Sequence, residues 1–379
     1  MQRIPGRATA IGRPFAADDP AASDPSARFD PTVAQSARVY SFWLGGKDHF
    51  PADREVAREV MRLRPQVLAG ARANRAFGRR VTSLVACGAG IRQFLDIGAG
   101  LPAPGSTHQT AHHASPACRV VYADNDPMVV AHIRAGLTSA PGAAPCSCIQ
   151  ADLRDPADLL AQASQVLDFT QPVAVLLLAV LHFLPDADDP AGIVAQIAAA
   201  LAPGSLIAIS HVTGDYAPRD IADSAAAYNA RVPVSIYPRS REQVAALLGG
   251  LPLQYPGVVP VSCWQPSLRE RAPQPVDIHA AVARLPRTAT CSLAASGRAA
   301  PPAAAGPEPG DEPEPDVTAG EMARRAEQFP AWHLDREVTG LGIRYVARAR
   351  VLGTRPHLVM TSDLVELCAQ LAGAQPGHG

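Results

Sequence analysis

The first periodic pattern of apolar residues in this chain follows Pro51. In the stretch ADREVAREVMRL the apolar residues recur at helical spacing, and a second such stretch runs from Gln66 to Cys87 and stops at Gly88. A third example begins at Asp189 and reads DPAGIVAQIAAALAPG. The pattern therefore predicts two helices ahead of the first strand and further helices after it.

Five short apolar runs follow the first two helices, and the gap after each leaves room for one helix. The runs begin at Arg92, Arg119, Cys146, Pro172 and Ser205. They are apolar on both faces and do not alternate, which is typical of strands buried in a parallel sheet. We therefore expect an α/β fold with a doubly wound, mainly parallel sheet. After a last helix in REQVAALLGG, the segment LPLQYPGVVPVSCW is expected to form a closing antiparallel pair.

Composition divides the chain into four parts. Residues 1–30 are expected to be a disordered tail, and residues 31–272 form the α/β domain. From residue 273 to 316 the chain is rich in proline and alanine and is expected to be a flexible linker. Residues 317–375 form a small α+β module, for which an αβββα order is predicted. A unit of this size has marginal stability when it folds alone, so we expect that it could need a protein partner.

The elements expected in this module are a helix over Ala319–Phe329, strands over Trp332–Val338, Leu341–Arg350 and His357–Met360, and a helix over Ser362–Leu371.

Charge and hydropathy argue against several classes of protein. The formal net charge of the 379 residues is -1, so the chain has no overall field that would attract nucleic acid. The longest apolar run, Val173–Leu181, is about half the length of a membrane span, which needs roughly 20 residues. Residues 1–30 lack the apolar core of a secretory signal, and the seven cysteines are scattered. We expect a cytoplasmic protein that binds neither membrane nor nucleic acid.

The most informative segment for chemistry is FLDIGAGLPAPG, at the end of the first apolar run. Gly98 and Gly100 allow a ligand to approach the backbone closely, and Asp96 precedes them. Read as G-x-G-x-x-A, the segment also fits a dinucleotide fingerprint. Pro102 and Pro104, however, delay the helix that a pyrophosphate would need beneath the glycines. This favours S-adenosylmethionine, whose ammonium group Asp96 could meet, although a purely structural turn is the alternative.

Acidic residues end the next two runs. Asp124 is placed where a carboxylate can accept hydrogen bonds from both ribose hydroxyls, while Asp126 is expected to cap the following helix. Asn125, between them, is included among the cofactor-binding residues. Asp152 and Leu153 follow the third run, where a side-chain acceptor and a backbone N–H could bind the adenine edge. The alternative for Asp124 is a purely capping role, and ADLRDP could equally be a turn.

His182 ends the fourth run, next to the expected position of the methyl sulfonium. It is a candidate for orienting the acceptor or taking its proton, with a packing role as the alternative. Methyl transfer requires no protein base, because proximity can supply much of the rate. His108, His112 and His113 could place two imidazoles on one face of a helix, which is the spacing of metal ligands. No Glu or third ligand accompanies that pair, so a solvated helix face is favoured and no metal is expected.

Taken in order, these motifs closely resemble a family of S-adenosylmethionine-dependent methyltransferases, abundant in actinobacteria and mostly without assigned substrates. The resemblance covers about residues 30–266. It rests on DPTVAQSARVYSFWLGGKDHFPADRE, ARANRAFGRR, RQFLDIGAGLPAPG, VVYADNDPMV, ADLRDP, AVLHFLPD and PGVVPVSCW. It implies a Rossmann-like class I methyltransferase fold with seven strands.

The resemblance also implies that the segment before the sheet folds over the cofactor. Arg38 and Gly46 are then cofactor-binding residues, and Tyr40, which supplies a hydroxyl, is the second catalytic candidate beside His182. The alternative for this segment is a helix pair that only covers the sheet. Arg72 and Asn74, with the neighbouring Arg75, could reach the cofactor carboxylate, and the alternative for them is a solvated helix face.

We therefore expect methyl transfer from S-adenosylmethionine to a small-molecule acceptor, in specialised metabolism by family analogy alone. One rival function is that of a regulatory protein that binds S-adenosylmethionine without catalysing methyl transfer. Its C-terminal module would then signal to a partner whether the ligand is bound. A second rival is a nicotinamide oxidoreductase. The C-terminal module resembles small actinobacterial domains of unknown function.

Overall fold

The computed structural model describes residues 30–137, 142–265, 274–286, 329, 332–339, 342–349 and 358–361. The predicted tail, apart from Asp30, lies outside the described residues, as do the later part of the predicted linker and, apart from Phe329, the two predicted helices of the C-terminal module.

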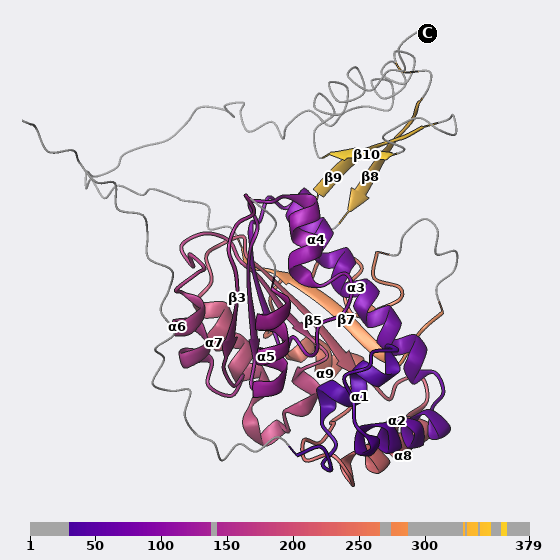
Figure 1. Ribbon diagram of the computed structural model, residues 1–379. Coiled ribbons are helices and arrows are strands. Elements are labelled where there is room, and N and C mark those ends of the chain that lie inside the picture. Colours follow the sequence, from indigo (N-terminus) through magenta and orange to yellow (C-terminus); the bar gives the residue numbers. More distant parts are fainter. Residues whose placement is uncertain are drawn as a thin grey trace, which may run out of the picture.

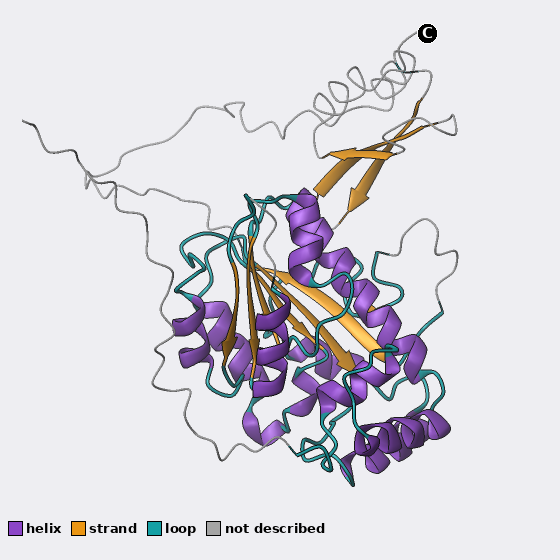
Figure 2. Cartoon of the chain, in the orientation of Figure 1, coloured by secondary structure: helices purple, strands orange, loops and turns teal. Residues whose placement is uncertain are grey.

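A seven-stranded sheet forms the centre of the domain, in the order β3-β2-β1-β4-β5-β7-β6 (Figures 1 and 2). Strands β1 to β5 run parallel, and β7 is antiparallel to both of its neighbours. The strands are β1 Gln93–Ile97, β2 Arg119–Asp124, β3 Cys146–Gln150, β4 Ala174–Leu178, β5 Leu206–Val212, β6 Val259–Pro260 and β7 Ile278–Arg284. The five predicted strands and the α/β fold class are confirmed.

The predicted start of the linker at residue 273 is wrong. Residues 278–284 form β7, which pairs with β5 from Leu206↔Arg284 to Val212↔Ile278 and is buried along almost its whole length. The sequence IHAAVAR is rich in alanine, and alanine is depleted in strands. Small side chains are accommodated here because helices cover both faces of the sheet. The α/β domain therefore extends past residue 272.

The fourth apolar run is longer than its strand. β4 ends at Leu178, and Ala179 has a positive φ of 58°. The next residues, Leu181–Phe183, form a short 3₁₀ turn, η1. A positive φ is uncommon for a residue with a Cβ, and such residues cluster at functional sites. His182 is thus carried by a turn just beyond the strand and not by the strand itself.

Two layers of helices cover the sheet. One apolar cluster joins residues of α3, α4 and α5 to one face, and a second joins residues of α6, α7 and α9 to the other. The bounds are α3 Val67–Gly88, α4 Thr107–Ala114, α5 Pro127–Gly136, α6 Pro156–Ala163, α7 Pro190–Ala199 and α9 Arg241–Ala246. The predicted caps are confirmed, since Asp126 accepts from the N–H of Met128 and Asp189 from that of Gly192.

Three further helices pack together beside the sheet, α1 Ser36–Trp43, α2 Pro51–Leu63 and α8 Pro218–Asn229 (Figure 1). Their apolar side chains form a third cluster that includes Trp43, Val60 and Tyr228. The two helices predicted ahead of the first strand, α2 and α3, are confirmed to within a residue at most of their ends.

In the C-terminal module, the strands β8 Trp332–Thr339, β9 Gly342–Ala349 and β10 Leu358–Thr361 form an antiparallel sheet in the order β10-β9-β8. They confirm the three strands predicted there. Within the described part of the chain, no helix has the length and apolar character needed to cross a membrane.

Candidate functional site

A cavity of about 1020 Å³ opens where β1, β2, β4 and β5 end. Parallel strands of an open α/β sheet present their carboxyl ends at one edge, which is where ligands of such folds bind. Helices α1, α2, α3, α4, α5 and α8 supply most of the remaining walls, with η1 and the start of β7. The predicted site residues that line it are Arg38, Tyr40, Asn74, Asp96, Gly98, Gly100, Asp124, Asn125 and His182.

The two glycines after β1 adopt conformations that favour glycine, with φ of +70° at Gly98 and +64° at Gly100. A Cβ added to Gly98 would lie 2.4 Å from Cγ2 of Val180, which follows β4. At Gly100 no atom lies within 4 Å of such a Cβ. Gly98 therefore allows the end of β1 to pack closely against Val180. At Gly100 the missing side chain leaves room for a ligand to approach the backbone.

Asp124 links the ends of β1 and β2. Its Oδ2 accepts from the N–H of Gly100 at 3.0 Å, and its Oδ1 accepts from the N–H of Asp126 at 3.0 Å. Burial raises the pKa of this carboxyl group to about 6, against the opposing effect of the two N–H donors. Each oxygen keeps a second lone pair, so the carboxylate can still accept two hydrogen bonds from a diol.

Asp96, at the end of β1, is 9% exposed and lines the same cavity. Its Oδ2 accepts a hydrogen bond of 2.6 Å from Oγ1 of Thr107, the first residue of α4. Burial raises the pKa of Asp96, while Thr107 and the charge of Arg75 oppose that rise. A buried carboxylate of this kind favours a cationic ligand group close by.

Arg75 on α3 presents an unused donor. One of its terminal nitrogens donates to the carbonyl oxygen of Leu101 at 3.2 Å, and its guanidinium carbon lies 5.8 Å from the centre of the Tyr40 ring. Its Nε is buried and has no hydrogen-bond partner. Nε faces the protein, but Arg75 lines the cavity, so its guanidinium is a candidate partner for a ligand carboxylate.

Tyr40 belongs to a chain of hydrogen bonds that reaches β5. Its hydroxyl donates to the carbonyl oxygen of Ala71 at 3.2 Å and accepts from Nδ2 of Asn74 at 3.1 Å. Oδ1 of Asn74 in turn accepts from Oγ of Ser210 at 2.6 Å. Burial raises the pKa of Tyr40, which keeps it a neutral phenol. Ser210 was not predicted, because a serine within an apolar run carries no motif.

His182 on η1 is 5% exposed and lines the cavity, yet its Nδ1 is buried without a partner. The His182 ring makes edge contacts with Phe183, at 4.3 Å between centroids, and with His211 of β5, at 5.7 Å. Burial, followed by His211 and Arg239, lowers the pKa of His182 well below its usual value. The imidazole is therefore neutral and resists protonation, so it can accept a hydrogen bond but is a weak base.

Arg239, 5% exposed, holds the turn that carries His182. Its guanidinium donates to the carbonyl oxygens of Leu181 at 3.2 Å and Leu184 at 2.8 Å, and pairs with Asp186 at 2.6 Å. It also lies 3.0 Å from Nε2 of His211. Because the backbone oxygen of Val212 accepts from Nδ1 of His211 at 2.8 Å, Nε2 of that ring must be the acceptor for Arg239.

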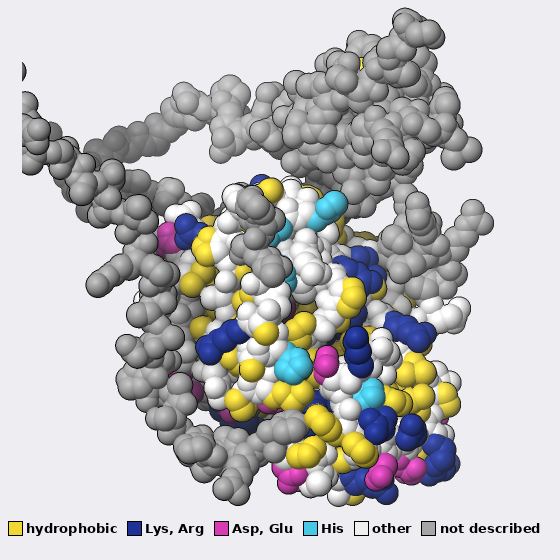
Figure 3. All heavy atoms as spheres, in the orientation of Figure 1, with side chains coloured by type: hydrophobic (Ala, Val, Ile, Leu, Met, Phe, Trp, Pro, Cys, Tyr) yellow, Lys and Arg dark blue, Asp and Glu magenta, His cyan; other side chains and the backbone are white. Residues whose placement is uncertain are grey.

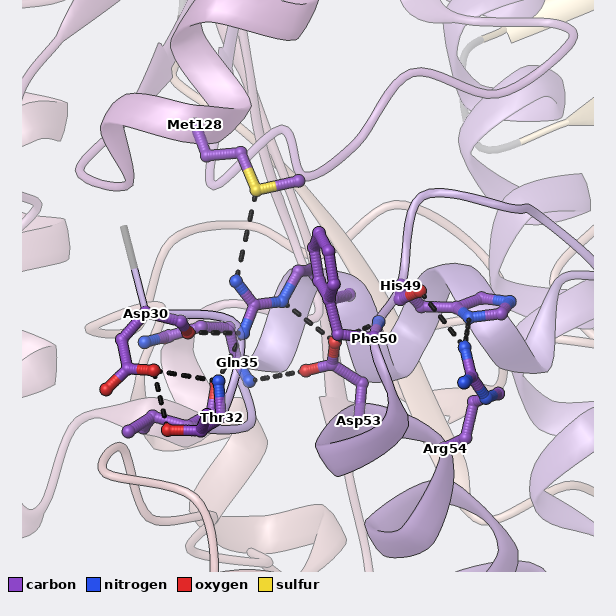
Figure 4. Close-up of polar contacts among 10 residues, drawn as sticks. Asp30, Thr32, Gln35, His49, Phe50, Asp53, Arg54 and Met128 are labelled. Carbon is purple, nitrogen blue, oxygen red and sulfur yellow. Dashed lines mark hydrogen bonds and ion pairs between the residues drawn. The ribbon is translucent and has the colours of Figure 1, made fainter. Parts of the chain in front are cut away.

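The N-terminal segment is fastened by a buried ion pair (Figure 4). Nε of Arg38 donates to Oδ2 of Asp53 at 2.9 Å, and the two side chains are 3% and 0% exposed. Asp53 also accepts from the N–H groups of Gln35 and Phe50. A further nitrogen of Arg38 lies 4.0 Å from the sulfur of Met128, at the cavity wall. Much of the guanidinium thus holds the fold together and one edge of it faces the cavity.

Four predicted residues lie outside the cavity lining. Arg72 is exposed, and the side chain of Leu153 belongs to the apolar core. Gly46 is required by a turn, since a Cβ there would lie 2.2 Å from Oγ of Ser41. Asp152 reaches the cavity only through Asn125, whose Nδ2 donates to it at 3.2 Å. The predicted cofactor roles of these four residues stay predictions.

Two of the three histidines of α4, His108 and His112, have partners within the protein. His108 lies 2.8 Å from the hydroxyl of Tyr122, and Nε2 of His112 lies 2.8 Å from the carbonyl oxygen of Cys118. Across the described ranges, no group of three or more His, Cys, Asp or Glu side chains could hold a metal ion.

Comparison with known proteins gives one family. The sequence model of the S-adenosyl methyltransferase family matches residues 22–286. The solved structure of a DUF574 family protein from Streptomyces avermitilis is 37% identical and covers 68% of this chain and 100% of its own, with a TM-score of 0.66. A candidate methyltransferase from Thermobifida fusca is 32% identical and covers 69% of this chain and 98% of its own, with a TM-score of 0.62. A search of curated proteins finds no match.

Proposed function

Because the chain belongs to the S-adenosyl methyltransferase family, we propose that its methyl acceptor is a small molecule, bound in the part of the cavity beside the ends of β4 and β5. The cofactor is S-adenosylmethionine, which supplies an electrophilic methyl group on a sulfonium. The residues of the chain then have to bind that cofactor, orient the acceptor and exclude water.

The residues at the ends of β1 and β2 fit this cofactor. Asp124 keeps two free lone pairs for the ribose hydroxyls, and the open space at Gly100 lets the ligand approach the backbone. Asp96 offers a buried carboxylate for the ammonium group. Arg75, which lines the cavity, offers its guanidinium to the carboxylate. We assign these four residues to the cofactor. Asn74 and Tyr40, which hydrogen-bond to each other, form the cavity wall beside them.

One observation carries the proposal for the acceptor. The cavity is continuous from Asp124 on β2 to Ile221 and Tyr228 on α8 and has a volume of about 1020 Å³. Pockets for a single drug-sized ligand range from about 300 to 1,000 Å³. The cavity is thus large enough to hold a second small molecule beside the cofactor, and His182 lies on the wall beyond β4.

Charge supports a small molecule over a polyanion. The net charge of the chain is -1, and on the face shown in Figure 3 basic and acidic side chains lie intermixed over α2 and α8. Nucleic-acid binding generally uses a basic patch or stripe.

The test supplies S-adenosylmethionine with a tritiated methyl group to the protein and an actinobacterial cell extract. The extract is divided beforehand by ultrafiltration into a small-molecule and a macromolecular fraction. We expect label in the small-molecule fraction with the wild type and with Arg72→Gln, and none with Asp124→Ala. Label confined to the macromolecular fraction would contradict the proposal. Binding of the cofactor without label in either fraction would favour a non-catalytic regulatory protein.

A further inference from the structure

The part of the cavity away from the cofactor residues has a distinct chemical character. We call it the acceptor half, and define it as the cavity lining contributed by α2, α8, β7, η1 and the residues 64–70, 212, 234–236 and 277. Most of its side chains are apolar, among them Val60, Val67, Ile221, Ile236 and Ile278. Burial of a ligand's apolar surface against such a wall stabilises the complex by roughly 25 cal/mol for each Å² removed from water.

The charges in the acceptor half compensate one another. Of the described residues that line it, Arg64 and Asp277 carry full charges, and they pair through two hydrogen bonds of 2.8 and 3.1 Å. Arg64 also reaches Asp220 at 3.1 Å. A charged acceptor would have to lose its hydration here without gaining an unpaired counter-ion, which is costly.

Two of the other polar groups in the acceptor half are committed to the protein, while Gln66 is exposed to solvent. Oγ of Ser224 donates to the carbonyl oxygen of Ile221 at 3.1 Å, and Tyr228 hydrogen-bonds to Ser36. His182 differs from these groups, because it lines the cavity while 5% exposed, and its Nδ1 is buried against the protein, which leaves Nε2 as the ring nitrogen for a ligand. The acceptor half therefore offers one hydrogen-bonding ring on an apolar wall.

From this arrangement we propose that the methyl acceptor is an uncharged molecule with an apolar, ring-sized body and a hydroxyl group that hydrogen-bonds to His182. This inference rests on the proposed function and narrows its substrate class. In the transfer, the hydroxyl oxygen bonds to the methyl carbon, and the bond from that carbon to sulfur breaks with its electron pair moving to sulfur. His182 accepts the hydrogen bond of the hydroxyl and orients its oxygen toward the methyl carbon, and the methylated oxygen then releases its proton to water, because methyl transfer requires no protein base.

His211 and Arg239 are positioning residues for this step. Arg239 fixes the backbone on either side of His182 through the oxygens of Leu181 and Leu184. The rings of His211 and His182 pack edge to face, and hydrogen bonds with Val212 and Arg239 hold His211 in one tautomer. Burial lowers the pKa of His211 to about 4, so this neighbour is neutral at physiological pH. Both residues act on the acceptor only through His182.

The test uses four naphthalene probes that share a body and differ in one substituent: 2-naphthol, naphthalene, 2-naphthoate and 2-naphthylmethylammonium. Their affinities for the protein saturated with S-adenosylhomocysteine are measured by ligand-observed NMR. We expect 2-naphthol to bind most tightly, about 5 to 10-fold better than naphthalene for one hydrogen bond, and the two ions to bind at least about 10-fold more weakly than 2-naphthol. His182→Phe should abolish the preference for 2-naphthol over naphthalene, whereas Ser224→Ala should keep it.

The outcomes separate this inference from the function on which it rests. Tightest binding of 2-naphthoate would mean that Arg64 attracts an anion and would overturn the inference. Binding of S-adenosylhomocysteine with no preference for 2-naphthol, or a preference that survives His182→Phe, would overturn it while leaving methyl transfer intact. Failure of S-adenosylhomocysteine to bind would overturn both.

Discussion

The carboxylate of Asp124 accepts a hydrogen bond of 3.0 Å from the backbone N–H of Gly100, twenty-four residues earlier in the chain. This contact joins the glycine turn after β1 to the end of β2, two features that the sequence places far apart. It fixes the edge of the cavity at which the cofactor is expected to bind. The same carboxylate must remain ionised to accept hydroxyl donors from a ligand, which makes its protonation state important.

Binding of S-adenosylmethionine should depend on pH through Asp124. Burial raises the pKa of this group to about 6, so the carboxyl is protonated below that pH and loses acceptor capacity. We expect the affinity to be level above about pH 7 and to fall as the pH drops below about 6, by up to about tenfold per unit. Calorimetry across this range measures it. Asp124→Asn should bind weakly and lack this step, and a step retained in the variant would assign it to another group.

Gly98→Ala should destabilise the protein more than Gly100→Ala. Both glycines have similar positive φ values, so both variants incur the left-handed penalty of about 1–2 kcal/mol. Only at position 98 does the new Cβ meet a neighbour, Val180, which adds about 1–3 kcal/mol for overpacking. Thermal unfolding measures the difference, for which we expect several degrees. Adding Val180→Ala should recover part of the loss, and equal effects at the two glycines would rule out the close contact.

Asp53→Asn should be strongly destabilising. Asp53 is fully buried, pairs with the buried Arg38 and accepts two backbone N–H groups. Removing one partner of a buried pair typically costs about 3–5 kcal/mol. The matched control is Glu59→Gln, since Glu59 pairs with Arg62 on the surface, where an ion pair contributes little to stability. The free energy of unfolding in urea would be compared, and similar values for the two variants would contradict this account.

Arg239→Gln should weaken methyl transfer and leave cofactor binding nearly intact. The guanidinium holds the turn of His182 but does not line the cavity. We expect unchanged affinity for S-adenosylmethionine and at least about tenfold less label transfer in the extract assay, since displacement of a catalytic group by 1 Å can cost 10²-fold. Arg239→Lys should recover little, because one ammonium cannot match the planar set of donors. Loss of cofactor affinity would place Arg239 in the cofactor site instead.

Local sequence patterns were sufficient to predict the five parallel strands of the sheet. Each strand from β1 to β5 is an apolar run, and Gly98 and Asp124 stand at strand ends where the ligand edge of the sheet must lie. The alanine-rich β7 was missed, since its place in the sheet depends on pairing with β5, more than 60 residues earlier in the chain. The 3₁₀ turn after β4 was also missed, because a continuous apolar run conceals the positive φ of Ala179.

Contacts between distant segments explain the rest of the site. Arg239 lies 58 residues from Leu181 in the chain, and Ser210 lies 136 residues from Asn74. No spacing rule connects such pairs, and both form only when the sheet brings β4, β5 and α3 together. Arg72 shows the converse, since it lies on the same helix as Asn74 but faces solvent.

Calorimetric titration with S-adenosylmethionine, and separately with NAD, tests the central claim most directly when wild type, Asp124→Ala and Arg72→Gln are compared. We expect S-adenosylmethionine to bind the wild type and Arg72→Gln alike, Asp124→Ala to weaken this binding by about 10-fold or more, and NAD to give no heat of binding. Binding of NAD, or unchanged affinity for S-adenosylmethionine in Asp124→Ala, would show that the cavity is not a site for the methyl donor held by Asp124.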